Sequence, residues 1–197
     1  NHYTANIRLR SNDAYTAGGK AGFRPDHAAT IYTQILKRLY PHVPVVVGGI
    51  EASLRRLTHY DYWSDSLKPS MIVESGADLL IYGMGERVVQ QVAKAMRNGY
   101  NAKLLRKINQ VAFVADKSYV ERLNPDTTKI LHSYEECCRD KRAFAENFVE
   151  EETLSNVMEP TTTLVEQVGE KYVVVTPPNT TLSTEELDHS FDLPYER

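Results

Sequence analysis

Two short apolar runs each end in a glycine turn that is followed by a glutamate. Gly48-Gly49 precedes Glu51, and Gly83-Met84-Gly85 precedes Glu86. Glycine allows the backbone to approach a ligand closely, and helix amides after such a turn can bind an anion. A pair of carboxylates can move a proton or hold a metal ion. If the two runs are neighbouring parallel strands, both turns and both glutamates face one crevice.

Each of these residues also has a purely structural explanation. A glutamate in the first turn of a helix stabilises the positive end of the helix dipole, and a tight turn between strand and helix requires glycine by itself. Arg55, Arg56 and Arg87 follow closely in the sequence and could form ion pairs with the two acids. The sequence leaves both explanations open.

The stretch from His59 to Asp65 combines one imidazole, two carboxylates and three aromatic rings. Loops that line pockets have this mixture, so we expect an irregular segment over the crevice. We assign no catalytic residue and no metal ligand. The residues predicted to line a substrate or cofactor crevice are Gly48, Gly49, Glu51, Ser53, Arg55, His59, Asp61, Trp63, Gly83, Gly85 and Glu86.

The other chemically reactive residues give no recognisable motif. The histidines are scattered without a pair at metal-binding spacing, which argues against zinc. Cys137 and Cys138 are the only cysteines, and an iron-sulfur cluster needs three or four thiolates. Neither a dinucleotide-binding fingerprint nor a P-loop is present.

The elements that must position the crevice alternate between strand and helix. Apolar runs at residues 43–47, 78–82 and 111–114 are separated by helical patterns, the longest at 25–40 and 86–97. This alternation predicts an α/β fold with an open, mostly parallel sheet flanked by helices, either Rossmann-like or a cobalamin-binding-type half. We assign residues 1–130 to this α/β domain and expect missing strands before Asn1.

Residues 131–197 have a different pattern and are predicted to form an α+β appendage. A capping box at Ser133 opens a long helix, residues 164–175 form a β-hairpin, and Ser183 starts a short helix that leads into a linker. The linker is expected to continue into a domain that is missing from this chain.

Composition and charge limit the function classes. With 42% hydrophobic and 25% charged residues and no apolar stretch of about 20 residues, the chain reads as soluble and cytoplasmic, without a membrane partner. Basic residues predominate in residues 1–134 and acidic ones in 135–197. Because no basic cluster is interleaved with aromatic residues, nucleic acid is not favoured as a partner. An unpaired sheet edge could support a homodimer.

Two long segments resemble a known family. The runs PVVVGGIEASLRRLTHYDYWSD (residues 44–65) and ADLLIYGMGER (residues 77–87) are similar to the N-terminal region of YgiQ-type radical S-adenosylmethionine (SAM) proteins. Shorter segments share the resemblance: residues 1–6, 11–15, 24–26, 172–174, 177–178 and 193–195.

The resemblance implies an accessory domain. In the family, this region precedes a C-terminal radical SAM domain, which binds a [4Fe-4S] cluster through a C-x-x-x-C-x-x-C motif and cleaves SAM. That motif does not occur here, so the parent protein is expected to be the enzyme, with the radical SAM domain of the same polypeptide as partner. The glycine turns also look like those of cobalamin-binding-type domains, but the D-x-H-x-x-G signature is absent and cobalamin is not favoured.

Two alternatives come from other functional classes. Glu51 and Glu86 with a divalent ion could serve a stand-alone hydrolase or transferase. The glycine turns could instead belong to a module that only binds a nucleotide or cobalamin. Neither the substrate nor the reaction of the parent enzyme follows from the sequence.

Overall fold

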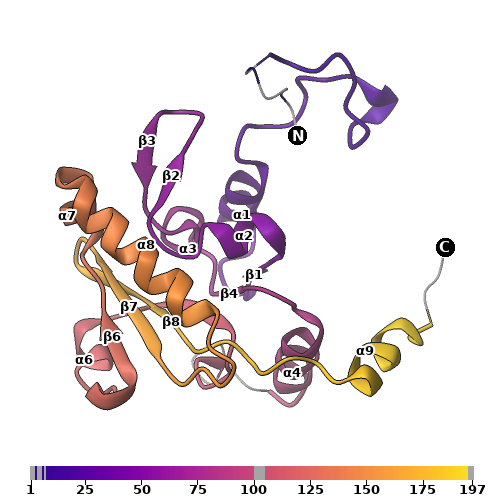
Figure 1. Cartoon of the computed structure of the whole chain (residues 1–197). Coiled ribbons are helices and arrows are strands. Elements are labelled where there is room, and N and C mark those ends of the chain that lie inside the picture. The colour runs from indigo at the N-terminus through magenta and orange to yellow at the C-terminus, as the bar shows by residue number, and fades with distance from the viewer. Residues whose placement is uncertain (1–2, 4–5, 7, 100–104, 195–197) are drawn as a thin grey trace.

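The computed structural model describes residues 3, 6, 8–99 and 105–194. Within these residues, a six-stranded sheet has helices on both sides, and a separate two-stranded sheet projects from it (Figure 1). The predicted α/β class, an open sheet flanked by helices, is confirmed. None of the helices in the described part of the chain combines the length and apolarity that a bilayer-spanning helix needs.

The six-stranded sheet is mixed, with a parallel pair at each edge. Its strand order is β1-β4-β5-β8-β7-β6. The pairs β1–β4 and β6–β7 are parallel, whereas β4–β5, β5–β8 and β7–β8 are antiparallel. The strands are β1 (Val46–Val47), β4 (Leu79–Ile81), β5 (Val111–Ala115), β6 (Thr128–Ile130), β7 (Thr163–Val168) and β8 (Lys171–Val175).

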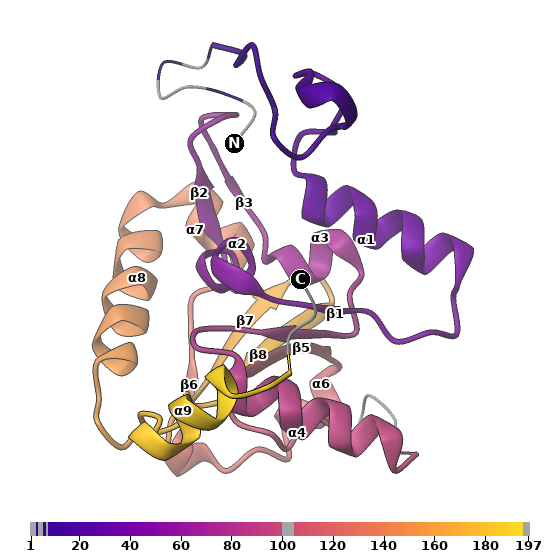
Figure 2. The same ribbon diagram turned by 90° about the vertical axis from the view of Figure 1, so that its right-hand side faces the viewer.

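Helices lie on both sides of this sheet. In both views α1 (Ala28–Leu39), α2 (Gly49–Leu54) and α3 (Met71–Ser75) lie on one side, and α4 (Glu86–Arg97) and α6 (Lys117–Val120) lie on the other (Figure 1, Figure 2). The remaining helices of the described residues are α7 (Tyr134–Arg139), α8 (Lys141–Ser155), α9 (Thr184–Phe191) and the 3-10 turns Ala17–Gly19 and Pro125–Thr127. α7 contacts β7, and α9 contacts α4.

The hydrophobic core surrounds the three central strands β4, β5 and β8. Each of them carries at least three consecutive buried residues, so both faces of the sheet are covered there. Burying one side chain of this size contributes about 1.5–3 kcal/mol, and these strands therefore hold the fold together. The buried residues are Leu79, Leu80, Ile81, Val111, Ala112, Phe113, Val173, Val174 and Val175.

Strand β5 runs antiparallel to β4, where the alternation of strands and helices predicted a parallel neighbour. Ile81 is paired with Val111. The backbone oxygen of Gln110 accepts a hydrogen bond from Tyr82 N at 3.3 Å, which places the start of β5 beside the end of β4. The prediction failed because an apolar run indicates burial and contains no information about strand direction.

The hairpin β7–β8, predicted to lie in an appendage, is part of the main sheet. β8 pairs with β5 from Ala112↔Val175 to Ala115↔Tyr172. Strands β7 and β8 therefore share one sheet with β1, β4, β5 and β6. The physical reason is that Val173, Val174 and Val175 are all buried, and a free-standing hairpin could not bury both of its faces.

The segment from His59 to Asp65, which was expected to be irregular, belongs to a second hairpin. In it, β2 (His59–Asp61) pairs with β3 (Ser66–Lys68). Asp61 closes its turn, because its carboxylate accepts hydrogen bonds from Ser64 N at 3.0 Å and Ser64 Oγ at 2.6 Å.

The long helix predicted from Ser133 consists of two helices, α7 and α8. The capping box formed by Ser133 and Glu136 is present as predicted. Asp140 interrupts the helix with φ of −132°, and its carboxylate accepts a hydrogen bond from Arg142 N at 2.8 Å. Aspartate is a strong N-cap residue, so a second helix starts there.

Candidate functional site

Strands β1 and β4 bring the two glycine turns to the same edge of the sheet. The strands are parallel, with Val46 paired with Leu79 and Val47 with Leu80. The first turn leads into α2 and the second into α4. The two turns are therefore neighbours at the carboxyl ends of parallel strands, as the pattern predicted.

Both turns line one groove of about 720 Å³. Gly48, Gly49, Gly83, Gly85 and Glu86 are among its lining residues. One wall is an apolar face of α4, formed by Val89, Val92 and Met96. Ser190 and Leu193, from α9 and the segment that follows it, complete the lining, so the end of the described chain lies at this groove (Figure 2).

Ser53 connects the two glycine turns. Its hydroxyl donates a hydrogen bond to Gly49 O at 2.8 Å and accepts one from Gly83 N at 2.9 Å. Gly49 and Gly83 have φ of +85° and +66°, a backbone conformation that residues other than glycine rarely adopt. Backbone conformation and the Ser53 side chain therefore both contribute to the shape of the groove at its two turns.

The two glutamates predicted to share the crevice are not brought together. Glu86 lines the groove, and its Oε2 is buried without a hydrogen-bond partner among the described residues. Glu51 is outside the lining and forms an ion pair of 3.0 Å with Arg55, one helical turn later. Glu51 is thus paired with an arginine of its own helix, which is the structural explanation that the sequence left open.

Arg55 is the centre of a second cluster. Its Nη1 lies 3.0 Å from His27 Nδ1, and its Nη2 lies 3.9 Å from Asp61 Oδ1. Burial lowers the pKa of His59, and the nearby Arg55 charge acts in the same direction. The predicted site residues thus divide into separate places, with the glycines, Ser53 and Glu86 at the groove and Glu51, His59 and Asp61 around Arg55.

Trp63 lies in the turn of the β2–β3 hairpin, outside the lining of the groove. Its ring packs on Tyr3, with the ring centroids 4.1 Å apart and an angle of 35° between the planes. A contact between two aromatic rings accounts for this position by packing.

Gln110 supports the second glycine turn, a role that sequence reasoning missed. Its Nε2 donates hydrogen bonds to Tyr82 O at 2.6 Å and to Met84 O at 2.5 Å, on either side of Gly83. Its Oε1 accepts a hydrogen bond from Asn179 N at 3.3 Å. A glutamine before a strand gives no sequence signal for this role, since its partners are 26 or more residues away.

A carboxylate is buried beneath α8. Glu166 on β7 is 1% exposed and accepts a hydrogen bond from Thr58 N at 2.9 Å. Burial raises its pKa to about 7, although that hydrogen bond acts to lower it. The neighbouring acid Glu151 forms an ion pair of 2.8 Å with Arg56, and its negative charge acts to raise the pKa of Glu166 further.

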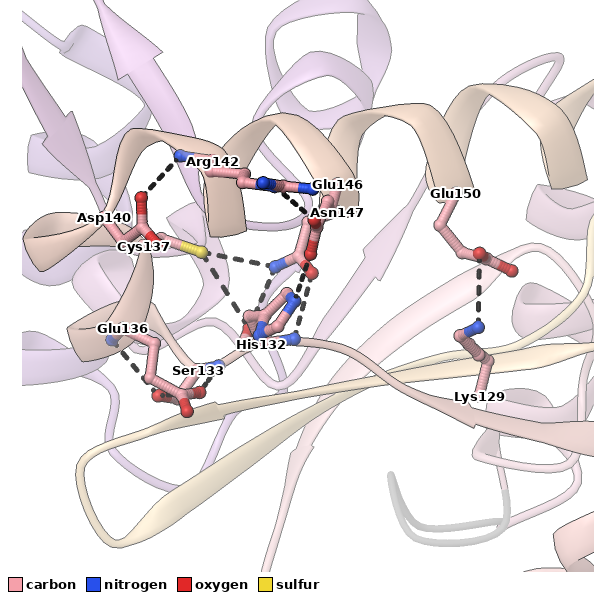
Figure 3. A network of polar contacts seen from close by, with 10 residues as sticks. All are labelled: Lys129, His132, Ser133, Glu136, Cys137, Asp140, Arg142, Glu146, Asn147 and Glu150. Carbon is pink, nitrogen blue, oxygen red and sulfur yellow. Dashed lines mark hydrogen bonds and ion pairs between the residues drawn. The ribbon is translucent and has the colours of Figure 1, made fainter.

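The two cysteines are not arranged as ligands. Figure 3 shows Cys137 in a polar network between α7 and α8, where Asn147 Nδ2 lies 3.3 Å from its sulfur. The same amide holds His132 through hydrogen bonds of 2.9 Å to its backbone N and O. Burial raises the pKa of Cys137 to about 12, which keeps its thiol protonated, while Cys138 is exposed. In the described residues no group of three His, Cys, Asp or Glu side chains could hold a metal ion.

The geometry defines the class of protein as an α/β domain with an apolar groove at the carboxyl ends of two parallel strands. The family model described as "Radical SAM N-terminal" matches residues 1–197. The chain therefore belongs to the radical SAM N-terminal family.

The curated relatives are longer proteins. A UPF0313 protein of Porphyromonas gingivalis is 49% identical over 197 residues, which cover 100% of this chain and 31% of that protein. UPF0313 proteins of Bacteroides thetaiotaomicron and Clostridium perfringens are 46% and 41% identical, again over 100% of this chain and over 33% and 29% of their own lengths. The chain thus spans about a third of the relatives it matches. No solved structure is significantly similar to it.

Proposed function

We propose that this chain is the accessory N-terminal domain of a YgiQ-like radical SAM enzyme of the cytoplasm. In this proposal the rest of the polypeptide binds the [4Fe-4S] cluster and SAM, and this domain contributes one wall of the substrate crevice. Family membership and the threefold greater length of the relatives support it.

The residues of this chain do not fit the cluster itself. A [4Fe-4S] centre of this kind takes thiolates from three cysteines, and the sequence contains two. Cys137 is buried and accepts a hydrogen bond from Asn147, and the exposed thiol of Cys138 remains. The proposal therefore assigns this chain binding and positioning, and assigns the redox chemistry to the remainder of the polypeptide.

The groove beside the glycine turns carries the proposal, because its surroundings are incomplete without a partner. Ile50 is 81% and Met84 62% exposed at its rim. Glu86 Oε2 is desolvated with no partner in the described residues, which costs free energy that a further donor would recover. Large exposed apolar side chains around a groove mark an interaction site. Leu193, near the end of the described residues, also lines the groove.

The isolated 197-residue chain is expected to be colourless after incubation with iron and sulfide, and unable to cleave SAM. The physical reason is its shortage of thiolates. The measurement is the visible absorbance and the release of 5′-deoxyadenosine under strong reductant, with the intact polypeptide as the positive control. Iron-dependent cleavage by the isolated chain would refute the division of labour proposed here.

A photo-crosslinking residue at position 50 in the intact polypeptide is expected to react with residues beyond Arg197. Ile50 sits at the groove rim, where the partner would dock. Ile130 is a matched control, because it is also an exposed isoleucine but lies on the opposite edge strand, β6. Mass spectrometry identifies the joined peptides. Equal crosslinking from both positions, or none from position 50, would contradict docking at the groove.

A further inference from the structure

A second cavity, of about 310 Å³, lies among α1, α3 and the β2–β3 hairpin. Its lining includes His27, Thr30, His59, Lys68 and Glu74, and it shares no lining residue with the glycine-turn groove. We propose that this cavity binds a small zwitterion that carries a hydroxyl group, of the size of a hydroxy amino acid. This proposal is independent of the one made for the groove.

His27 presents a hydrogen-bond donor. Arg55 Nη1 lies 3.0 Å from its Nδ1, and a guanidinium group can only donate. Nδ1 therefore accepts, and the ring hydrogen is assigned to Nε2. Among the described residues Nε2 has no protein partner. His27 also has φ of +52°, which for a residue with a side chain requires support from its surroundings.

His59 presents the complementary acceptor. Its Nδ1 lies 3.2 Å from Leu57 O, and since a carbonyl oxygen only accepts, the hydrogen is on Nδ1. Nε2 then carries a lone pair and has no partner in the described part of the chain. Burial lowers the pKa of His59, with Arg55 and His27 contributing, so the ring is kept neutral.

Thr30 supplies an independent observation. Its side chain lines the cavity, and its hydroxyl is open to solvent there and forms no hydrogen bond with any described residue. The hydroxyl is therefore free to bond a group that enters the cavity. A ligand hydroxyl satisfies the three groups together: it accepts from His27 Nε2–H, donates to His59 Nε2, and bonds Thr30.

Charged groups on two sides of the cavity select the rest of the ligand. Lys68 comes from β3 and Glu74 from α3, and neither has an ion-pair partner among the described residues. Asp26, the other acid of the lining, is occupied by the Tyr3 hydroxyl. A carboxylate facing Lys68 and an ammonium group facing Glu74 complete a zwitterion that fits the available volume.

The test is a calorimetric titration of the intact polypeptide with L-homoserine, L-threonine and L-serine. At least one of them is expected to bind saturably. L-2-aminobutyrate is the matched probe, since it has the same charges and lacks the hydroxyl, and it should bind about tenfold more weakly. Absence of saturable binding by all three hydroxy amino acids, or equal binding of L-2-aminobutyrate, would overturn the proposal.

Two variants locate the binding. Thr30→Val, which is nearly isosteric, and His59→Phe are each expected to weaken binding of the best hydroxy amino acid about tenfold, with little effect on L-2-aminobutyrate. His42→Phe is the control, because His42 is exposed and lies outside the cavity lining. Thermal melting verifies that each variant is folded. Unchanged affinity in folded Thr30→Val would show that the ligand lies elsewhere.

Discussion

Replacing Gln110 with leucine is expected to lower the free energy of unfolding by about 3 kcal/mol. The side chain is 6% exposed, and it holds the carbonyl groups of Tyr82 and Met84 and the amide of Asn179. Leucine leaves these backbone groups without their partner. Gln110 has φ of +66°, and because both residues carry an unbranched Cβ, the backbone strain is similar before and after the change. The measurement is the urea midpoint at constant m value.

Gln91→Leu is the matched control for this prediction. Gln91 is exposed on α4, so the same substitution there is expected to change stability by no more than about 0.5 kcal/mol. For a chain of this size, the loss at Gln110 corresponds to a fall in melting temperature of roughly 6–12 °C. A Gln110→Leu variant as stable as Gln91→Leu would show that the second glycine turn does not depend on the glutamine.

Replacing Glu166 with glutamine is expected to make stability less dependent on pH. The pKa of Glu166 is raised from 4.5 to about 7 in the folded chain. Its carboxyl group therefore binds a proton more tightly in the folded state than in the unfolded state. Between these two values, stability of the native chain falls as the pH rises, and below pH 4.5 the group has no effect. Integrated over this range, the loss amounts to about 3 kcal/mol above pH 7.

Glutamine at position 166 keeps an acceptor for Thr58 N and cannot ionise. The variant should therefore be more stable than the native chain by about 3 kcal/mol above pH 7. The difference should vanish below pH 4.5. Urea unfolding at a series of pH values measures it. Glu170→Gln, at an exposed position in the turn of the same hairpin, is the control, and its stability should follow the same pH dependence as that of the native chain. A difference in the free energy of unfolding between Glu166→Gln and the native chain that is the same at all pH values would disprove the raised pKa of Glu166.

The local elements and the first neighbours in the sheet could be predicted from sequence. The pairing of β1 with β4 followed from two apolar runs with a helical pattern between them, and both capping boxes are where Ser133 and Ser183 indicated. The direction of β5 and the position of β8 could not be predicted. The β4–β5 pairing joins residues about 30 positions apart and the β5–β8 pairing joins residues about 60 positions apart, and the hydrophobicity of a buried strand does not identify its neighbour.

The candidate site was predictable only where backbone chemistry determines it. Glycines between strand and helix identified the groove, because their conformations are needed at any such turn. The separation of Glu51 from Glu86 depends on helix orientation. Gln110 and Thr30 gave no signal, since a polar residue becomes informative only when its burial and its distant partners are known.

The central place of β8 has a consequence for synthesis. This strand is the last of the sheet to leave the ribosome, yet it lies between β5 and β7. Until Val175 has emerged, β5 exposes an apolar edge in the nascent chain, and open edges of this kind recruit foreign strands. We expect the nascent polypeptide to need chaperone protection during that interval, and insertion of the late hairpin to end it.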